Sequence, residues 1–247
     1  MPQYGFFFDQ SRCSGCRACT VACKNWNSLP PGPLKYLRIY EYEKGPFPNC
    51  RIHFQWIPCY HCEAPCCVSV CPCEALYKEE KYGAVLVDNE KCDGCRRCYD
   101  ACPYGSLVFE NDELGVKAEK CTMCIDRLDQ GLKPVCVLSC SCRALDFDLL
   151  SHLAMRYGNK RDLEDMPESH IAKPAVIFKP HAAKRQLVTY NAERGLELMM
   201  KRDPLPAVYT STSEIKEIPK GMIGRDKLVL KHGSGDDLMC YTRSDEG

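Results

Sequence analysis

The chain has 247 residues and 33 basic against 33 acidic side chains, so it lacks the positive charge typical of nucleic-acid-binding proteins. No run of the sequence approaches the roughly 18 apolar residues that a membrane-spanning helix needs. The N-terminus has neither a basic segment with an apolar run nor a twin-arginine pair, so we expect a chain that is made in the cytoplasm and carries no export signal of its own. This length suits one domain or two.

The predicted elements begin with an aromatic strand at Tyr4–Asp9, which leads into the first cysteines. The segment from about residue 30 to 57 has a different character. Prolines and a glycine at its start mark a loop, and apolar residues alternate over Leu37–Glu43 and again over Arg51–Trp56. We therefore predict a β-hairpin-like insertion at about residues 30–57.

Sixteen of the 21 cysteines form four groups of four, and each group ends in Cys-x-x-x-Cys. In chain order the groups are Cys13, Cys16, Cys19 and Cys23; Cys59, Cys62, Cys67 and Cys71; Cys92, Cys95, Cys98 and Cys102; and Cys121, Cys124, Cys136 and Cys140. A β-type run over residues 83–88 leads into the third group. Proline follows Cys71 and Cys102 and stops the preceding helical turn. The internal repeat of strand, cysteine loop, short helix and strand indicates a ferredoxin unit.

Beyond residue 150 the cysteines nearly stop. We expect a short helix at Ser151–Tyr157 and a short strand between the prolines of residues 173–180. From His181 onward the chain is polar and weakly periodic, which is typical either of a solvated tail or of an arm that wraps a partner subunit. The predicted division is a four-cluster ferredoxin-like domain at residues 1–150 and a C-terminal extension at residues 151–247 that packs on a partner subunit.

The cysteine spacing is that of bacterial ferredoxins, in which three cysteines hold one iron–sulfur cube and the fourth reaches a neighbouring cube. Sixteen thiolates at four per cube predict four [4Fe–4S] clusters. Disulfides are disfavoured by the missing signal and the short, periodic spacings. Zinc sites pair two Cys-x-x-Cys knuckles and do not need the third and fourth cysteines of each group. The predicted fold class is α+β, with two intertwined double-cluster modules built from groups one and four and from groups two and three.

The ferredoxin crossover assigns a ligand set to each predicted cluster. Cys13, Cys16 and Cys19 take Cys140; Cys121, Cys124 and Cys136 take Cys23; Cys59, Cys62 and Cys67 take Cys102; and Cys92, Cys95 and Cys98 take Cys71. Within the adjacent pair Cys66 and Cys67, the second keeps the three-residue gap to the last cysteine of its group. The same argument favours Cys140 over Cys142.

The remaining cysteines are expected to be small apolar fillers near the clusters; they are Cys50, Cys66, Cys73, Cys142 and Cys240. Five basic residues flank the ligands and would either stabilise a reduced cluster or be solvated or paired with a partner: Arg12, Arg17, Lys24, Arg96 and Arg97. His61 is expected to orient its loop, and Trp26 and Trp56 to fill the core or shield a cluster. No nucleophile–base pair, phosphate loop or dinucleotide fingerprint stands in the sequence, so we expect no catalytic residues.

Ten short motifs resemble the iron–sulfur electron-transfer subunit of the dimethyl sulfoxide reductase family of molybdopterin enzymes. They span residues 3 to 182 and are Gln3-Tyr-Gly-Phe-Phe-Phe-Asp, Ser11-Arg-Cys, Arg38-Ile-Tyr-Glu-Tyr, His61-Cys-Glu-x-Pro, Gly94-Cys-Arg, Ala101-Cys-Pro-Tyr-Gly, Lys120-Cys, Gly131-Leu-Lys-Pro, Arg143-Ala-Leu-Asp-Phe and Lys173-Pro-x-Val. The chain departs from the family pattern at Ser141, which stands where a proline is usual. The tail beyond about residue 183 lies outside the resemblance.

The resemblance implies a large catalytic subunit, which would carry molybdenum or tungsten held by molybdopterin. It also implies that the present chain passes electrons between that subunit and a quinone-linked membrane subunit or a soluble donor. The cluster of Cys13 would lie nearest the catalytic metal and that of Cys71 at the far end. Family members are either co-exported with a catalytic subunit that bears a twin-arginine signal, to the outer face of the cytoplasmic membrane, or stay in the cytoplasm.

Two further interpretations remain open on the sequence alone. One is a free-standing polyferredoxin or an electron-transfer subunit of a formate- or hydrogen-linked complex. The other is a zinc-rich scaffold.

Overall fold

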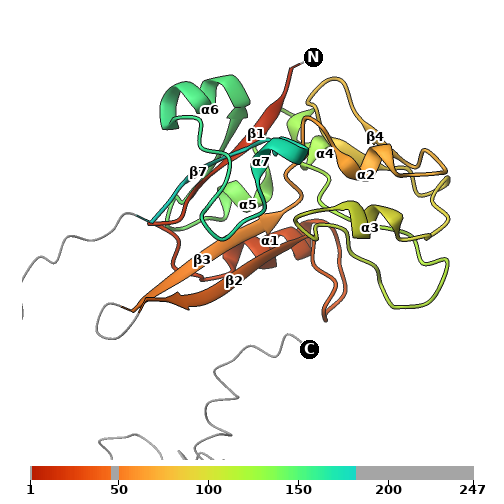
Figure 1. The fold of residues 1–247 in the computed structure, drawn as a ribbon, viewed down its shortest axis with the longest axis horizontal. Coiled ribbons are helices and arrows are strands. Elements are labelled where there is room, and N and C mark those ends of the chain that lie inside the picture. Colours follow the sequence, from red (N-terminus) through yellow and green to blue (C-terminus); the bar gives the residue numbers. More distant parts are fainter. Residues whose placement is uncertain (1, 46–49, 182–247) are drawn as a thin grey trace, which may run out of the picture. The chain divides into compact units, whose positions relative to one another are not determined.

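The computed structural model describes residues 2–45 and 50–181, and a three-stranded sheet organises one end of this part (Figure 1). Its central strand is β1 (Tyr4–Asp9), which pairs antiparallel with β6 (Leu145–Leu149) and parallel with β7 (Val176–Lys179). Five of the six residues of β1 are buried. Such two-sided burial explains why the strand is a run of aromatic residues rather than an alternating one.

The two faces of β1 contact different parts of the core. Phe6 and Phe8 lie in the main hydrophobic cluster, where Phe6 meets Trp56 edge-on at 5.1 Å between ring centroids. Phe7 faces the other way, toward helix α6 (Leu150–Tyr157), and stacks on Tyr157 at 3.7 Å between centroids. The helix expected at residues 151–157 therefore covers the outer face of the sheet.

The predicted hairpin is present as β2 (Leu37–Lys44) and β3 (Arg51–Pro58), paired antiparallel from Leu37 opposite Pro58 to Lys44 opposite Arg51. Its base is buried through Leu37, Ile39 and Trp56, while its far end projects from the rest of the fold (Figure 1). The hairpin therefore places Trp56 in the core beside the first cysteine group.

Five short helices of the described part each begin within a cysteine group: α1 (Ala18–Trp26), α2 (Cys66–Ser69), α3 (Arg97–Ala101), α4 (Ile125–Leu128) and α5 (Val135–Leu138). Helix α7 (Ser169–Ala172) lies further along the chain, outside these groups. A small hairpin of β4 (Leu76–Lys78) and β5 (Val85–Val87) lies between the second and third groups. Cys102 ends α3 in an extended conformation, as expected for a residue that precedes proline.

Helix contacts bring distant cysteine groups together. Helix α1 of the first group packs on α5 of the fourth, and α2 of the second packs on α3 of the third. In Figure 1, α2, α3 and β4 lie together at the right, while α1 and α5 lie nearer the middle.

The compact unit that contains the cysteine groups runs to Ala182, because β7 pairs with β1 and α6 packs on both strands. Residues 151–181 thus belong to the same body as the sheet. The tail or arm expected from residue 182 onward, with Cys240, lies outside the described residues. None of the helices in the described part has the length and apolar character needed to cross a bilayer.

Candidate metal centres

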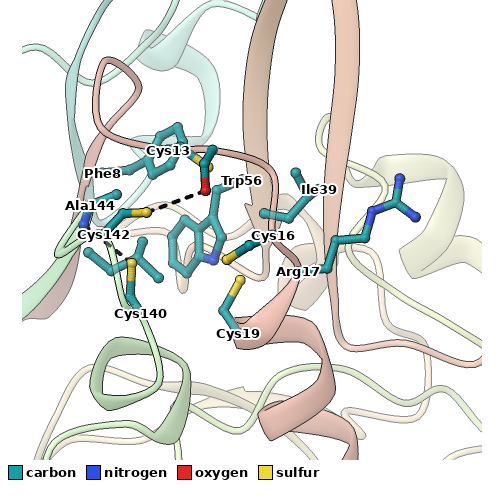
Figure 2. Close-up of a pocket in the computed structure, with 12 residues that line it drawn as sticks. Phe8, Cys13, Cys16, Arg17, Cys19, Ile39, Trp56, Cys140, Cys142 and Ala144 are labelled. Carbon is teal, nitrogen blue, oxygen red and sulfur yellow. Dashed lines mark hydrogen bonds between the residues drawn. The ribbon is translucent and has the colours of Figure 1, made fainter. Parts of the chain in front are cut away.

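The first predicted ligand set lines one hollow in the core (Figure 2). Cys13 and Cys16 come from the loop between β1 and α1, Cys19 lies on α1, and Cys140 follows α5. Figure 2 shows these side chains around the Trp56 indole, which is completely buried. The structure therefore brings residues 13–19 and 140, far apart in the chain, to a single site.

Within each of the four predicted ligand sets, the cysteines lie close to one another. We call them set A (Cys13, Cys16, Cys19 and Cys140), set B (Cys23, Cys121, Cys124 and Cys136), set C (Cys59, Cys62, Cys67 and Cys102) and set D (Cys71, Cys92, Cys95 and Cys98). The thiols of set A interact electrostatically with one another, as do those of set B and set C. Set D lines a second hollow, together with Gly94 and Arg96.

The sets also follow one another in the order A, B, C, D. Sets A and B share helix α1, which carries both Cys19 and Cys23. Cys121 of set B is an electrostatic neighbour of Cys59 of set C. Cys67 of set C likewise interacts electrostatically with Cys98 of set D. A path from A to D therefore passes through B and C.

Burial differs between the ends and the middle of this order. All four cysteines of set B are buried, and set C has none that is exposed. Sets A and D each have one exposed member, Cys16 and Cys95 respectively. These two residues occupy equivalent positions in the first and third groups, so both ends of the order reach the surface.

The surroundings of the thiols strongly disfavour their ionisation when no cation is bound. Burial, with the neighbouring thiols, raises the pKa of Cys19 and Cys23 to about 12. Burial likewise raises the pKa of Cys121 and Cys136 well above the ordinary value. Several thiolates can share such a site only if a cation compensates their charge. Iron prefers soft thiolate ligands, so the donor chemistry fits iron–sulfur clusters.

Glycine shapes the loops of the end sets. Gly15 and Gly94 have φ angles of +68° and +72°, a region that other residues rarely adopt. A Cβ atom on Gly94 would also lie 2.5 Å from the carbonyl carbon of Gly115. The next loop residues but one, Arg17 and Arg96, have positive φ as well. Such curled backbones turn successive N–H groups toward one centre and favour an anion there.

The last cysteine of every group accepts a hydrogen bond from the residue four positions later. The backbone N–H of Ala75, Ser106 and Ala144 donates to the sulfur of Cys71, Cys102 and Cys140, at 3.3, 3.5 and 3.3 Å. In the first group the donor is the side-chain amide of Asn27, whose Nδ2 lies 3.6 Å from Cys23 Sγ. The internal repeat of the sequence thus corresponds to a repeated N–H···S contact.

Five buried side-chain polar atoms in the described residues have no hydrogen-bond partner, and all five belong to residues near the thiol sets. They are Thr20 Oγ1, Trp56 Nε1, His61 Nε2, Arg96 Nε and Tyr104 Oη. Thr20, His61 and Arg96 adjoin set cysteines in the chain, Trp56 lines the hollow of set A, and Tyr104 neighbours Cys62 and Cys102. Buried polar groups normally find partners. Cluster sulfides beside the thiols would supply acceptors to donors of this kind, which is a second reason that the sites fit clusters.

In residues 2–45 and 50–181, no group of three or more His, Cys, Asp or Glu side chains is spaced to hold a single metal ion.

The cysteines outside the four sets differ in how they lie relative to the sets. Cys66 points to the carbonyl of Ala64 at 4.0 Å, whereas Cys67 is buried with set C. Cys142 lines the hollow of set A and lies 3.3 Å from Ser14 Oγ.

The remaining spare cysteines have polar neighbours. The Cys73 thiol forms a hydrogen bond with the side chain of Asp93 near set D. Cys50 is exposed on the hairpin, and its Sγ lies 3.7 Å from Glu43 Oε2. The expectation that these residues are apolar fillers does not describe Cys50, which lies on the surface.

The basic residues singled out from the sequence mostly contact other groups. Arg12 pairs with Asp9 at 3.7 Å, and Lys24 donates to the carbonyl of Gly32 at 2.8 Å. Figure 2 shows the Arg17 guanidinium directed away from the sulfurs of set A. Arg96 pairs with Asp112 at 3.3 Å and also lines the hollow of set D. Arg97 is exposed.

A cation that does contact the sulfur of a predicted ligand is Lys120, whose Nζ lies 3.6 Å from Cys59 Sγ. In the sequence, Lys120 stands out only as part of the motif Lys120-Cys. Its position next to a cysteine in the chain does not indicate which sulfur its side chain contacts. Trp56 is buried as expected, whereas Trp26 is 41% exposed and its Nε1 donates to Asp126 at 2.9 Å.

His61 is completely buried, and its Nδ1 accepts the backbone N–H of Val85 at 3.0 Å. Burial, with Lys120 and Lys78 nearby, lowers its pKa well below the ordinary value. The ring is therefore neutral and carries its proton on Nε2. It ties the loop of the second group to β5, as the expected orienting role requires.

Comparison with known proteins gives the family of the chain. The family model described as a 4Fe-4S dicluster domain matches residues 50–150. One component of the anaerobic dimethyl sulfoxide reductase of Escherichia coli (strain K12) is 42% identical over 191 residues, which is 74% of this chain and 91% of that protein. The chain thus belongs to the iron–sulfur subunits of the dimethyl sulfoxide reductase family.

Other relatives of this iron–sulfur protein carry the names of different enzymes. A component of the sulfite dehydrogenase of Allochromatium vinosum is 37% identical over 75% of this chain and 86% of its own length. The thiosulfate reductase electron transfer subunit of Salmonella typhi is 43% identical over 60% of this chain and 77% of its own. The resemblance inferred from the ten motifs is confirmed, and so is the expectation of iron–sulfur clusters.

Proposed function

We propose that this subunit relays single electrons along four [4Fe–4S] clusters held by sets A, B, C and D, in that order. The observation that carries the proposal is the distribution of burial, since one thiol is exposed in each end set and none in the two middle sets. Electrons then enter and leave at the two ends. The clusters supply one-electron redox chemistry when bound. The protein holds them in line and keeps water from the middle pair.

The sixteen cysteines are the ligands in this proposal, and the two intertwined modules are formed by sets A and B and by sets C and D. The contact of α1 with α5 and that of α2 with α3 support this division. The hydrogen bonds to the last cysteine of each group support it as well, because they hold each crossover sulfur in place.

The catalytic partner is proposed to be a large molybdopterin subunit that docks at set A, with set D facing a quinone-linked membrane subunit or a soluble donor. The names of similar subunits refer to enzymes of dimethyl sulfoxide, sulfite and thiosulfate. In this proposal the partner subunit, and not the present chain, therefore determines the substrate. In the proposed complex, residues 151–247 pack on the partner, and the complex lies either outside the cytoplasmic membrane, by co-export, or in the cytoplasm.

The deciding experiment is the metal content of the native complex, isolated without oxygen through a tag on this chain. We expect iron for four clusters, molybdenum or tungsten, and a large co-purifying subunit. Iron without the heavier metals and without a large subunit would instead indicate a free polyferredoxin. Zinc in place of iron, in a colourless preparation, would contradict the proposal altogether.

A further inference from the structure

Lys120 is a buried cation at the boundary between the two proposed modules. The residue is 4% exposed. The ammonium donates to the carbonyl of Val85, to the carbonyl of Cys121 at 3.0 Å, and to Cys59 Sγ at 3.6 Å. Cys121 belongs to set B and Cys59 to set C, so the charge lies where an electron crosses from one module to the other.

A buried ammonium is costly unless its protons are bonded and its charge is compensated. The three contacts of Lys120 use its three protons. Two of the acceptors are neutral carbonyls, and among these three partners only the Cys59 sulfur can carry a negative charge. The geometry therefore pairs the ammonium with the thiolate ligand rather than with a carboxylate.

Further donors surround set C. The Lys78 ammonium, on the neighbouring strand β4, donates to the carbonyl of Cys62 at 2.6 Å. The buried His61 Nε2 and Tyr104 hydroxyl, both without partners among the described residues, adjoin the same cysteines. At set B the corresponding side-chain contact to sulfur is a neutral amide, that of Asn27.

We propose that Lys120 raises the reduction potential of the set C cluster and so holds the transferred electron at the boundary between the modules. Adding an electron makes a cluster more negative, and a fixed positive charge in a medium of low dielectric constant stabilises that form. The ammonium contacts a set C sulfur directly, whereas its hydrogen bond at set B goes to the carbonyl of Cys121. It also interacts electrostatically with the thiols of Cys67 in set C and Cys121 in set B. Because only the set C contact is made directly to a sulfur, we expect the largest effect on set C. The inference rests on the ligand sets of the proposed function.

The test is a redox titration of the purified complex followed by electron paramagnetic resonance, in the unaltered protein and in Lys120→Met. Methionine has a similar length and no charge. We expect the reduction equilibrium of one cluster to fall at least ten-fold, which is a shift of about 59 mV for one electron, while the other clusters move less. The affected cluster is identified as the one whose signal is missing in Cys62→Ser.

Two more variants separate charge from hydrogen bonding. Lys120→Gln keeps a donor and loses the charge, so it should shift the same cluster in the same direction. Lys117→Met is the matched control, because Lys117 is an exposed lysine on the same segment and its removal should leave all potentials unchanged.

Several results would overturn the inference. One is an unchanged set C potential in both Lys120 variants, and another is an equal shift in all clusters. If Lys120→Met fails to assemble, Lys120→Arg, which keeps the charge, decides: a set C potential within two-fold of the original supports the inference, and a ten-fold fall contradicts it. Fewer than four clusters in the unaltered complex would contradict the proposed function itself, whatever the variants show.

Discussion

Neighbouring cysteines of this chain differ sharply in what they contact. Cys67 is buried among the thiols of set C, whereas the side chain of Cys66 is directed to a backbone carbonyl. Cys98 is buried beside Cys92 and Cys95, while Cys73, near the same set, bonds to Asp93. A cysteine in one of these loops is therefore not necessarily a cluster ligand. The sulfur must also be directed toward the common centre.

Replacing Cys98 with serine tests this distinction. We expect Cys98→Ser to lose or convert the set D cluster and to leave three clusters intact, because a hydroxyl is a poor substitute for a soft thiolate ligand. Iron analysis and spin counting of the reduced complex measure the change. Cys73→Ser is the control and should keep four clusters. Four intact clusters in Cys98→Ser would show that the ligand sets are assigned wrongly.

At the scale of elements, the cysteine loops depend on backbone conformation as much as on sulfur. Each end set is formed by a Cys-x-Gly-Cys turn in which glycine has positive φ, followed by a short helix that carries the next ligand. The chain contains this unit twice, at Gly15 and Gly94. The other two groups instead place His61 and Met123 at positive φ just before a ligand.

Gly94→Ala should disrupt the set D loop. Both Gly94 and Gly131 have φ of +72°, so alanine at either position costs about 1–2 kcal/mol of conformational strain. Only at Gly94 would the new Cβ also collide with backbone, at 2.5 Å, whereas at Gly131 nothing lies within 4 Å. We therefore expect Gly94→Ala to lower the unfolding temperature further than Gly131→Ala and to reduce the set D signal. Equal effects of the two substitutions would refute this account of the loop.

For the whole molecule, the clusters and the fold are mutually dependent. Many of the largest buried side chains adjoin the thiol sets, and the cysteines themselves form part of the two larger hydrophobic clusters. Sixteen thiols cannot all ionise in such surroundings without a cation. Assembly of the clusters is therefore expected to contribute to the stability of the described unit.

The thiol pKa values predict a pH dependence of cluster loading. Burial raises the pKa of Cys19, Cys23 and Cys67 to about 12, so these thiols keep their protons in the empty chain at pH 7 to 9. They must lose the protons to bind iron. Loading is then favoured as pH rises over this range and opposed as pH falls, by about 1.4 kcal/mol per thiol per pH unit.

Reconstitution in a weakly buffered solution measures this effect. We expect net proton release from the thiols, after correction for the iron and sulfide added, and a loading midpoint that moves to higher iron concentration as the pH is lowered from 9 to 7. The corresponding titration of a chain with the sixteen ligands replaced by serine gives the background. A loading equilibrium independent of pH would mean that the thiols are already ionised in the empty chain.

Features that depend on local spacing could be predicted from the amino-acid sequence alone. Ligand spacing within a group is a short-range constraint, so the four cysteine groups and their iron–sulfur chemistry could be read directly. The strand at Tyr4–Asp9 and the hairpin of β2 and β3 could also be predicted, since aromatic runs and alternation reflect local burial.

Features that depend on contacts between distant residues became visible only in the folded chain. The parallel pairing of β7 with β1, which carries the compact unit beyond residue 150, joins residues about 170 positions apart and leaves no periodic pattern. The position of Lys120 is the clearest case at the site. Its neighbour in the chain is a set B cysteine, but its long side chain reaches a set C sulfur and a strand carbonyl, because buried ammonium protons need acceptors that only the folded chain brings together.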